Sequence, residues 1–224
     1  MKVETSYHSI TQNSPVPEIF KIYLKNRGID GDESISRFLF PQLVDLPTPD
    51  KMQNLNEASD LVVKYMDEDK QIIVWGDYDV DGTTGTALLV NFFRECGVSV
   101  MWHIPNRLNE GYCLNVDWFD QNQKTLSAGG FLLITVDCGI SNRLEIAKIG
   151  KMGGEVIVTD HHSLPDNGLP KCLILNPVQR SCGFHNEQLA GVGVAFYLAA
   201  GIRSKLERIK KFSNTVSGIN LKQH

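Results

Sequence analysis

The chain has 224 residues, of which 42% are hydrophobic and 21% charged, and its formal net charge is −4. This composition is ordinary for a globular protein, and the acidic balance argues against a protein that coats nucleic acid with a broad basic surface. No apolar run approaches the roughly 18 residues of a membrane span, and residues 1–15 lack the apolar core of a secretory signal. We therefore expect no contact with a membrane. The five cysteines are scattered, so we expect reduced thiols and a cytoplasmic location.

Helices are predicted for the first part of the chain. Apolar residues recur at helical spacing in residues 17–27, and Gly28 follows as a stop signal. Residues 32–40 suggest a second short helix, the proline-bearing residues 41–50 read as a linker, and residues 54–70 form a further helix. We therefore divide the chain into an N-terminal helical segment with its linker (1–53), a main domain (54–212) and a tail (213–224).

The main domain has short apolar runs that alternate with helical patterns. The runs are residues 72–75, 98–104, 131–136, 155–159 and 172–176, and the helical patterns between them are residues 83–96, 115–126 and 141–150. Strands that are apolar throughout are typical of a parallel sheet covered on both faces. The predicted fold is therefore α/β, a mainly parallel sheet flanked by helices, with a small N-terminal helical segment. In such sheets ligands bind beyond the carboxyl ends of the strands.

Acidic residues and histidines follow three of these predicted strands. The sequences are GDYDVDG at residues 76–82, DCG at 137–139 and TDHH at 159–162. Asp79 and Asp81 are two residues apart, so in an extended loop both side chains can point the same way. We expect a helix to open at Thr83–Thr86, where free N–H groups can meet a phosphate. Three strands that deliver such residues to one edge favour a metal site over ordinary turns.

The spacing of the first three aspartates also matches the start of a calcium-binding EF-hand loop. That pattern needs a glutamate at the sixth position after the glycine, where this chain has Leu88. A mixture of carboxylates and imidazole instead suits Mn²⁺, with Mg²⁺ or Zn²⁺ possible. Several carboxylates can hold two ions about 3.5–4 Å apart, an arrangement suited to phosphoester hydrolysis.

The motifs GDYDVDG, VDCG and TDHH resemble motifs I to III of the DHH phosphoesterase superfamily. LKNRGI, NLNEASD, IPNRLNEGY, ILNP and LAGVGVAFYL also occur in the same order as in the RecJ-type single-strand-specific 5′→3′ exonucleases, which act in DNA repair and recombination. The likeness extends from about Pro17 to Arg203. It implies a DHH domain in residues 54–212, Mn²⁺ or Mg²⁺ as cofactor with two ions in the complete family site, and single-stranded DNA as substrate.

The resemblance also implies roles for individual residues. The implied metal ligands, or close neighbours of ligands, are Asp77, Asp79, Asp81, Asp137, Asp160 and His161. The implied catalytic residues are Asp79, Asp81, Asp137, His161 and His162. The implied substrate-binding residues are Thr83, Thr84, Arg107, His162, Asn176, Gly191 and Gly193.

The chain departs from the family pattern in three places. Trp75 replaces a common histidine, and Cys113 replaces a glycine, which is strained if the position needs a positive φ. The family continues with a fourth motif that carries a metal-binding aspartate and with a second domain. Residues 204–224 contain no aspartate, so we expect a chain cut before that motif, whose missing half or other repair proteins are candidate partners.

Two other functions stay open at this point. One is a DHH phosphoesterase that acts on oligonucleotides, cyclic dinucleotides or pyrophosphate, and the other is an inactive remnant that binds metal or a partner. Cys172, Cys182 and His185 have no fourth partner at zinc-site spacing, so we expect ordinary roles for them. The basic run at residues 203–211 reads as a solvated helix end. The sequence does not fix the oligomeric state.

Overall fold

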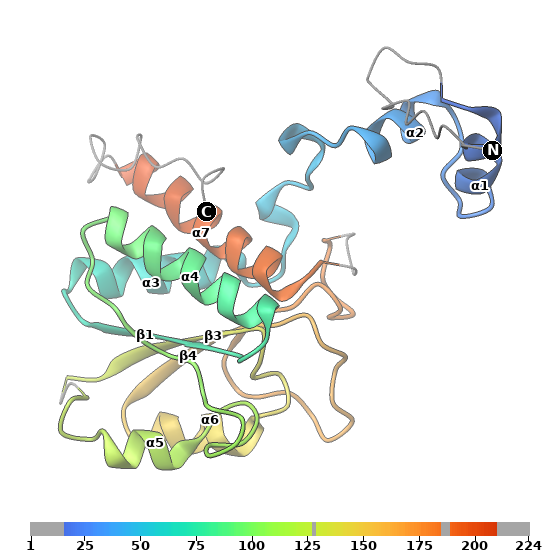
Figure 1. Cartoon of the computed structure of the whole chain (residues 1–224). Coiled ribbons are helices and arrows are strands. Elements are labelled where there is room, and N and C mark those ends of the chain that lie inside the picture. The colour runs from blue at the N-terminus through green and yellow to red at the C-terminus, as the bar shows by residue number, and fades with distance from the viewer. Residues whose placement is uncertain (1–15, 127–128, 185–188, 210–224) are drawn as a thin grey trace, which may run out of the picture. The chain divides into compact units, whose positions relative to one another are not determined.

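The computed structural model describes residues 16–126, 129–184 and 189–209 (Figure 1). The chain divides into two compact units, Met1–Pro47 and Thr48–His224. The predicted tail at residues 213–224 and His185 lie outside the described residues.

The first unit contains the two helices that the sequence predicts, α1 (Glu18–Lys25) and α2 (Asp32–Leu39), followed by the short 3₁₀ helix η1 (Leu43–Asp45). Gly28 ends α1 as expected. Its φ of 80° lets the chain reverse, so that the Ile29 amide donates to the Leu24 carbonyl at 3.0 Å and the Gly28 amide donates to that of Lys25 at 3.0 Å. Leu24 and Ile35 are the buried apolar residues of these helices.

The second unit alternates helices and strands. Its elements in chain order are η2 (Pro49–Lys51), α3 (Leu55–Asp67), β1 (Gln71–Gly76), α4 (Val80–Glu95), β2 (Met101–His103), α5 (Val116–Gln121), β3 (Phe131–Val136), α6 (Arg143–Lys151), β4 (Gly154–Thr159), β5 (Leu173–Leu175) and α7 (Gly191–Ile209). All neighbouring strands pair in parallel, in the order β2-β1-β3-β4-β5. This confirms the predicted α/β fold.

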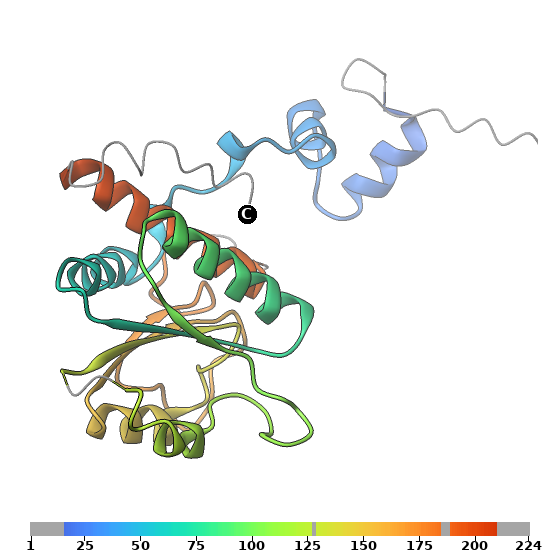
Figure 2. The same cartoon turned by 60° about the vertical axis from the view of Figure 1, so that its left-hand side comes forward.

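Helices cover both faces of the sheet, which is why the inner residues of β1, β3 and β4 are mostly apolar. Helices α3, α4 and α7 lie on one face and α5 and α6 on the other (Figures 1 and 2). Side chains alternate between the faces along each strand. Ile72 and Val74 of β1 pack in the cluster under α3, α4 and α7, whereas Ile73 and Trp75 pack in the cluster with α5 and α6. All four side chains are fully buried.

Some predicted bounds are wrong. Strand β2 spans only Met101–His103 of the predicted run 98–104, and α5 ends at Gln121 although the pattern continued to residue 126. Helix α4 begins at Val80 and not at Thr83, because the side chain of Asp79 caps it. The expected linker at residues 41–50 contains η1 and runs into η2.

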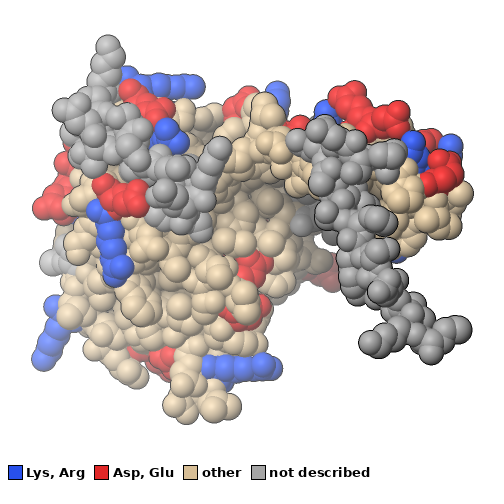
Figure 3. Space-filling model, turned by 45° about the horizontal axis from the view of Figure 1, so that its top comes forward, with Lys and Arg blue, Asp and Glu red and all other residues tan. Residues whose placement is uncertain are grey.

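The composition predicts reduced cysteines and no broad basic surface, and the described residues can be compared with both expectations. The five cysteines are all free. On the part of the surface shown in Figure 3, uncharged residues cover most of the middle and basic side chains lie toward the margins. None of the helices in the described ranges combines the length and apolar character that crossing a membrane requires.

Candidate metal centre

The predicted metal-binding residues meet where the strand order reverses. The connection from β1 leads through α4 to β2 on one side, and the connection from β3 leads through α6 to β4 on the other, so the two diverge at the carboxyl ends of β1 and β3. Asp77 follows β1 and Asp137 follows β3, and both are buried, with 2% and 1% of their surface exposed. Their amides extend the sheet by donating to Val136 at 3.1 Å and to Thr159 at 2.9 Å. This is the position where sheets of this class bind ligands.

Asp79 and Asp81 lie at the start of α4. The Asp79 carboxylate accepts from the Gly82 amide at 2.9 Å, so Asp79 is the N-cap and Asp81 already lies within the helix. The expectation that both residues occupy an extended loop is therefore wrong. Both oxygens of Asp81 accept from the first amides of α7, from Gly191 at 2.7 Å and from Val192 at 2.6 Å. Asp81 thus joins the first turns of two neighbouring helices.

Glycine makes this close approach possible at two positions. A Cβ on Gly82 would lie 2.6 Å from the backbone nitrogen and oxygen of Asp77, so only glycine lets α4 start against that strand end. A Cβ on Gly191 would lie 2.4 Å from Oδ1 of Asp137. Both substitutions would force a side chain against the groups that form the site.

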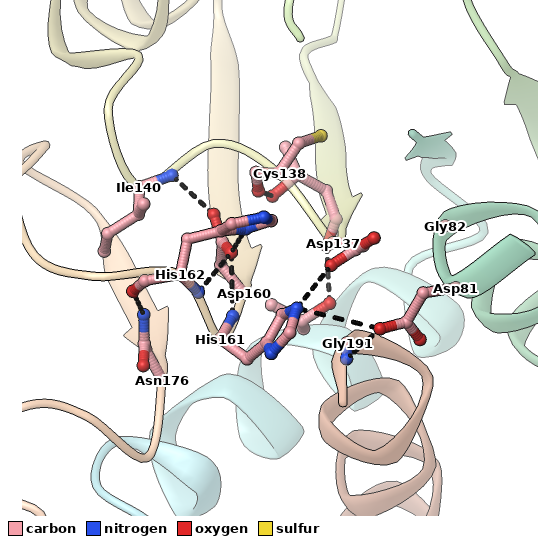
Figure 4. Close-up of polar contacts among 12 residues, drawn as sticks. Asp81, Gly82, Asp137, Cys138, Ile140, Asp160, His161, His162, Asn176 and Gly191 are labelled. Atoms are coloured by element: carbon pink, nitrogen blue, oxygen red, sulfur yellow. Dashed lines mark hydrogen bonds and ion pairs between the residues drawn. The ribbon is translucent and has the colours of Figure 1, made fainter. Parts of the chain in front are cut away.

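The loop after β4 is organised by Asp160, which is 1% exposed. One of its oxygens accepts from the amides of His161 at 2.7 Å and His162 at 3.0 Å, and from Nδ1 of His162 at 2.7 Å. The other oxygen accepts from the Ile140 amide at 3.0 Å. The Asp160 carboxylate is thus used to shape the loop (Figure 4).

The two histidines face different neighbours. Nε2 of His161 lies 3.1 Å from Asp137 and 3.7 Å from Asp81 (Figure 4). The side chain of His162 is 46% exposed, and its Nδ1 contacts Asp160, so Nε2 is the ring nitrogen that does not bind Asp160. His161 therefore points into the carboxylate cluster, whereas His162 is available to a molecule from solution.

The environment changes the protonation of several of these groups. Burial, followed by the carboxylates of Asp81 and Asp79, raises the pKa of Asp137 to about 8. Burial also raises the pKa of Asp77. The hydrogen bond to Asp160 raises the pKa of His162 to about 9. Burial opposes the charge of Asp160, but hydrogen bonds from the ring and amide of His162 and from Ile140 outweigh it and lower the pKa of that carboxyl.

These shifts favour the cationic form of His162 and the protonated form of Asp137 at neutral pH. A proton on a buried carboxyl among other carboxylates relieves the same repulsion that a divalent cation would relieve. Oδ1 of Asp137 is buried and finds no hydrogen-bond donor of suitable geometry among the described residues, although His161 is close. An acceptor without a donor is a ready metal ligand.

Two sets of three residues have donor atoms close enough to share an ion. One set is Asp77, Asp79 and Asp137, and the other is Asp137, His161 and His162. Within each set the ligand atoms lie within 4.8 Å of one another, and Asp137 belongs to both. The residues present therefore fit one or two divalent metal ions, with a carboxylate able to serve both.

Several residues expected to bind substrate are occupied within the protein. Thr83 donates its amide to the Asp79 carbonyl at 2.9 Å, and the hydroxyls of Thr83 and Thr84 donate to carbonyls of the preceding turn. Asn176 is fully buried, donates to the His162 carbonyl at 2.9 Å and accepts from the Val178 amide at 2.9 Å. Asn176 thus supports the histidine loop. Gly193 lies against Leu189, where a Cβ would be 2.5 Å from that side chain.

Arg107 lies beside the first motif. Its guanidinium carbon is 5.1 Å from the ring centre of Tyr78, and Tyr78 in turn contacts Tyr112 at 6.0 Å between ring centres. The sequence reasoning singled out Arg107 but missed the two tyrosines. The signal was present, since Tyr78 stands within GDYDVDG and Tyr112 within NEGY.

Two residues near the site adopt the left-handed backbone conformation that glycine usually fills. Cys113 has a φ of 66°, so the strain foreseen for a cysteine at this position is present. Asp137 has a φ of 60°, which no pattern in the sequence predicts. Aspartate tolerates this conformation better than most residues.

The chain is similar to a known family and to curated proteins. The family model "DHH family, N-terminal domain" matches residues 71–219. The chain is 34% identical over 200 residues to the single-stranded-DNA-specific exonuclease RecJ of Bacillus subtilis, covering 88% of this chain and 25% of the relative. It is 36% identical over 193 residues to RecJ of Escherichia coli, covering 85% of this chain and 32% of the relative. The chain thus spans about a quarter to a third of these relatives.

Solved structures show the same likeness. A RecJ exonuclease bound to manganese matches with a TM-score of 0.62 and 37% identity, covering 69% of this chain and 38% of that one. RecJ from Thermus thermophilus in complex with Mn²⁺ matches with a TM-score of 0.60 and 28% identity, covering 86% of this chain and 28% of that one.

Proposed function

Since the chain belongs to the DHH family, we propose that it is the metal-binding part of a phosphodiesterase that removes nucleotides from the 5′ end of single-stranded DNA. The observation that carries the proposal is the position of Asp137, which lies in both sets of potential metal ligands. We propose Mn²⁺ or Mg²⁺ as the ions, since carboxylate and imidazole donors suit them. The five free cysteines fit a reducing compartment, so we place the activity in the cytoplasm.

The ligands would be Asp77, Asp79 and Asp137 on one side and Asp137, His161 and Asp81 on the other. Asp81 lies 3.7 Å from His161 and would turn from the α7 amides toward the ion. Bound divalent ions would supply an activated water and stabilise the developing charge of phosphoester hydrolysis. The remaining residues bind and orient the strand.

His162 and Arg107 supply positive charge for a phosphate. His162 is cationic at pH 7 because Asp160 fixes its Nδ1 proton, and it presents its exposed edge to solution. Arg107 is exposed and stacks on Tyr78 beside the carboxylates. The net charge of the chain is −4, so we propose that local cations of this kind hold the nucleic acid instead of a broad basic surface. Thr83, Thr84, Gly191 and Gly193 stay predictions as substrate contacts.

A nuclease assay tests the proposal. Single-stranded DNA with a 5′ phosphate and a 3′ label is incubated with the purified chain in Mn²⁺ and in EDTA, beside Asp137→Ala. We expect digestion from the 5′ end that needs Mn²⁺ and is lost in the variant. Cleavage no faster than that of the variant would refute the proposal.

Two further measurements separate the alternatives. Cleavage of a dinucleotide or pyrophosphate, but not of long strands, would assign a different substrate to the same site. Isothermal titration with Mn²⁺ that shows binding by the wild type and its loss in Asp137→Ala, together with no cleavage, would leave a metal-binding protein without nuclease activity.

A further inference from the structure

The loop between β2 and α5 is a built structure around Asn106. The Asn106 carbonyl accepts from the amides of Asn109 at 3.1 Å and Glu110 at 2.8 Å. Its side-chain oxygen accepts from the Leu108 amide at 3.0 Å. Arg107 lies in the middle of this turn. Its backbone position is therefore set by hydrogen bonds on both sides.

Glu110 ties this turn to the sheet. Its Oε2 accepts from the Asn106 amide at 2.6 Å, and its two oxygens lie 3.1 and 3.2 Å from Nε2 of His103, the last residue of β2. The pair is mostly buried, with 21% of the His103 side chain and 26% of the Glu110 side chain exposed. A partly buried pair of this kind holds its geometry better than a fully exposed one.

Rigid aromatic residues fix His103 in turn. Its ring lies 4.5 Å from the ring of Trp75 and 5.0 Å from that of Trp118. Trp75 is fully buried in β1, directly before the first metal-binding motif. The same core that carries Asp77 thus carries the anchor of the loop.

The residue that this loop presents is a free cation. Within the described parts of the chain, Arg107 forms no ion pair, and its guanidinium rests on Tyr78 at 5.1 Å. The backbone of Tyr78 is held by its amide, which donates to the Asp77 carboxylate at 2.8 Å, and its ring contacts that of Tyr112. Arg107 is therefore held next to the carboxylate cluster with its hydrogen-bond donors unused by acidic groups.

We propose that Glu110 and His103 are positioning residues, which hold Arg107 over Tyr78 so that its guanidinium meets a phosphate of the strand that enters the metal centre. This inference rests on the proposed function. An arginine whose loop is already ordered loses less conformational freedom when it binds a phosphate. Removing the anchor then weakens substrate binding while leaving the metal ligands in place.

A double-mutant cycle tests the coupling. KM and kcat are measured on 5′-phosphorylated single-stranded DNA in Mn²⁺ for the wild type, Glu110→Ala, Arg107→Ala and the double variant. We expect Glu110→Ala to raise KM about two- to tenfold with little change in kcat. In the Arg107→Ala background the same change should leave KM nearly unaltered, because the residue through which Glu110 acts is gone.

Conservative and control variants sharpen the result. Glu110→Gln should recover most of the wild-type KM, since its amide oxygen still accepts from Asn106. Glu33→Ala breaks an exposed ion pair with Arg37 in the first unit and should change neither constant. An equal rise of KM with and without Arg107, or a fall of kcat alone, would overturn the proposal in favour of a merely structural role.

A second readout does not depend on nuclease activity. Trypsin cleaves after arginine, and a loop that opens more often is cleaved faster. We expect cleavage after Arg107 to be several-fold faster in Glu110→Ala and in His103→Leu than in the wild type or Glu33→Ala. If the wild type cleaves no DNA, the proposed function fails, and an unchanged rate of cleavage after Arg107 would still overturn the positioning role.

Discussion

Replacing Asp81 separates its two roles in the structure. In its proposed role as a metal ligand, Asp81 lies among other carboxylates, repels them in the metal-free protein and raises the pKa of Asp137. Removing it should then stabilise the metal-free chain. As a cap, it holds the first turn of α7 through two amides at 2.7 and 2.6 Å. Loss of a helix cap costs about 0.5–2 kcal/mol, and loss of a hydrogen bond to a charged group costs about 1.5–3 kcal/mol.

We expect the cap to dominate. The side chain of Asp81 is 23% exposed, so water weakens both its repulsion of the other carboxylates and its hydrogen bonds to α7. The hydrogen bonds are direct contacts, so water weakens them less than the repulsion. Asp81→Ala should therefore lower the free energy of unfolding in EDTA by about 1–2 kcal/mol, and Asp81→Asn by less, since one oxygen remains. Each kcal/mol corresponds to about 2–4 °C in Tm for a protein of this size.

Thermal unfolding in EDTA, followed by circular dichroism, measures this difference. Asp120→Ala removes the same charge from an exposed position of α5 and should change stability by less than about 0.5 kcal/mol. With added Mn²⁺ the gap between wild type and Asp81→Ala should widen, because a bound ion stabilises only the folded protein that holds it. An Asp81→Ala chain that is as stable as the wild type in EDTA, or more stable, would refute the capping role.

Three other results follow from the structure. In EDTA the free energy of unfolding should fall as pH rises from about 4 to about 8, because folded Asp137 keeps its proton to about pH 8 while the unfolded chain releases it near 3.8. Urea titrations at pH 5 and 8 should show a smaller fall for Asp137→Asn than for the wild type, and an equal fall would contradict this reasoning. Gly82→Ala should cost about 1–3 kcal/mol in urea denaturation because its Cβ would meet the Asp77 backbone, and a neutral effect would show that α4 can shift. Cys113→Gly should be more stable than Cys113→Ala by about 0.5–1 kcal/mol, because φ is 66° at this position, whereas alanine is usually the more stabilising of the two residues. A more stable Cys113→Ala would show that the loop relaxes.

The strands and the edge at which the site forms could be predicted from local patterns. The runs at 131–136 and 155–159 became β3 and β4 nearly residue for residue, because strands covered on both faces are mostly apolar and stand out from the polar segments around them. The acidic and histidine motifs follow the ends of these strands, so they had to meet at one edge of the sheet, because parallel strands bring their carboxyl ends together there. Strand β2 was overestimated, because only three residues pair with β1, whereas Val98 and Val100 pack against the core without pairing.

The chemistry of the individual side chains depended on contacts between distant residues. Asp81 and Gly191 are far apart in sequence, and only the packing of α4 against α7 makes one the cap of the other. Asn176 looked like a substrate contact but is buried against the His162 carbonyl. The ring of His103, at the end of β2, contacts Glu110, Trp75 and Trp118, and only the folded chain brings these three residues together around it.

The sequence by itself determined the family, the parallel sheet and the residue types of the candidate metal centre, because apolar periodicity and motif spacing are properties of neighbouring residues. The tertiary structure alone decided which carboxylate belongs to both candidate ligand sets, which has a raised pKa and which caps a helix. Burial and charge at each carboxyl depend on groups brought from other strands and helices, so Asp137 and Asp160, each following a strand, have pKa values shifted in opposite directions.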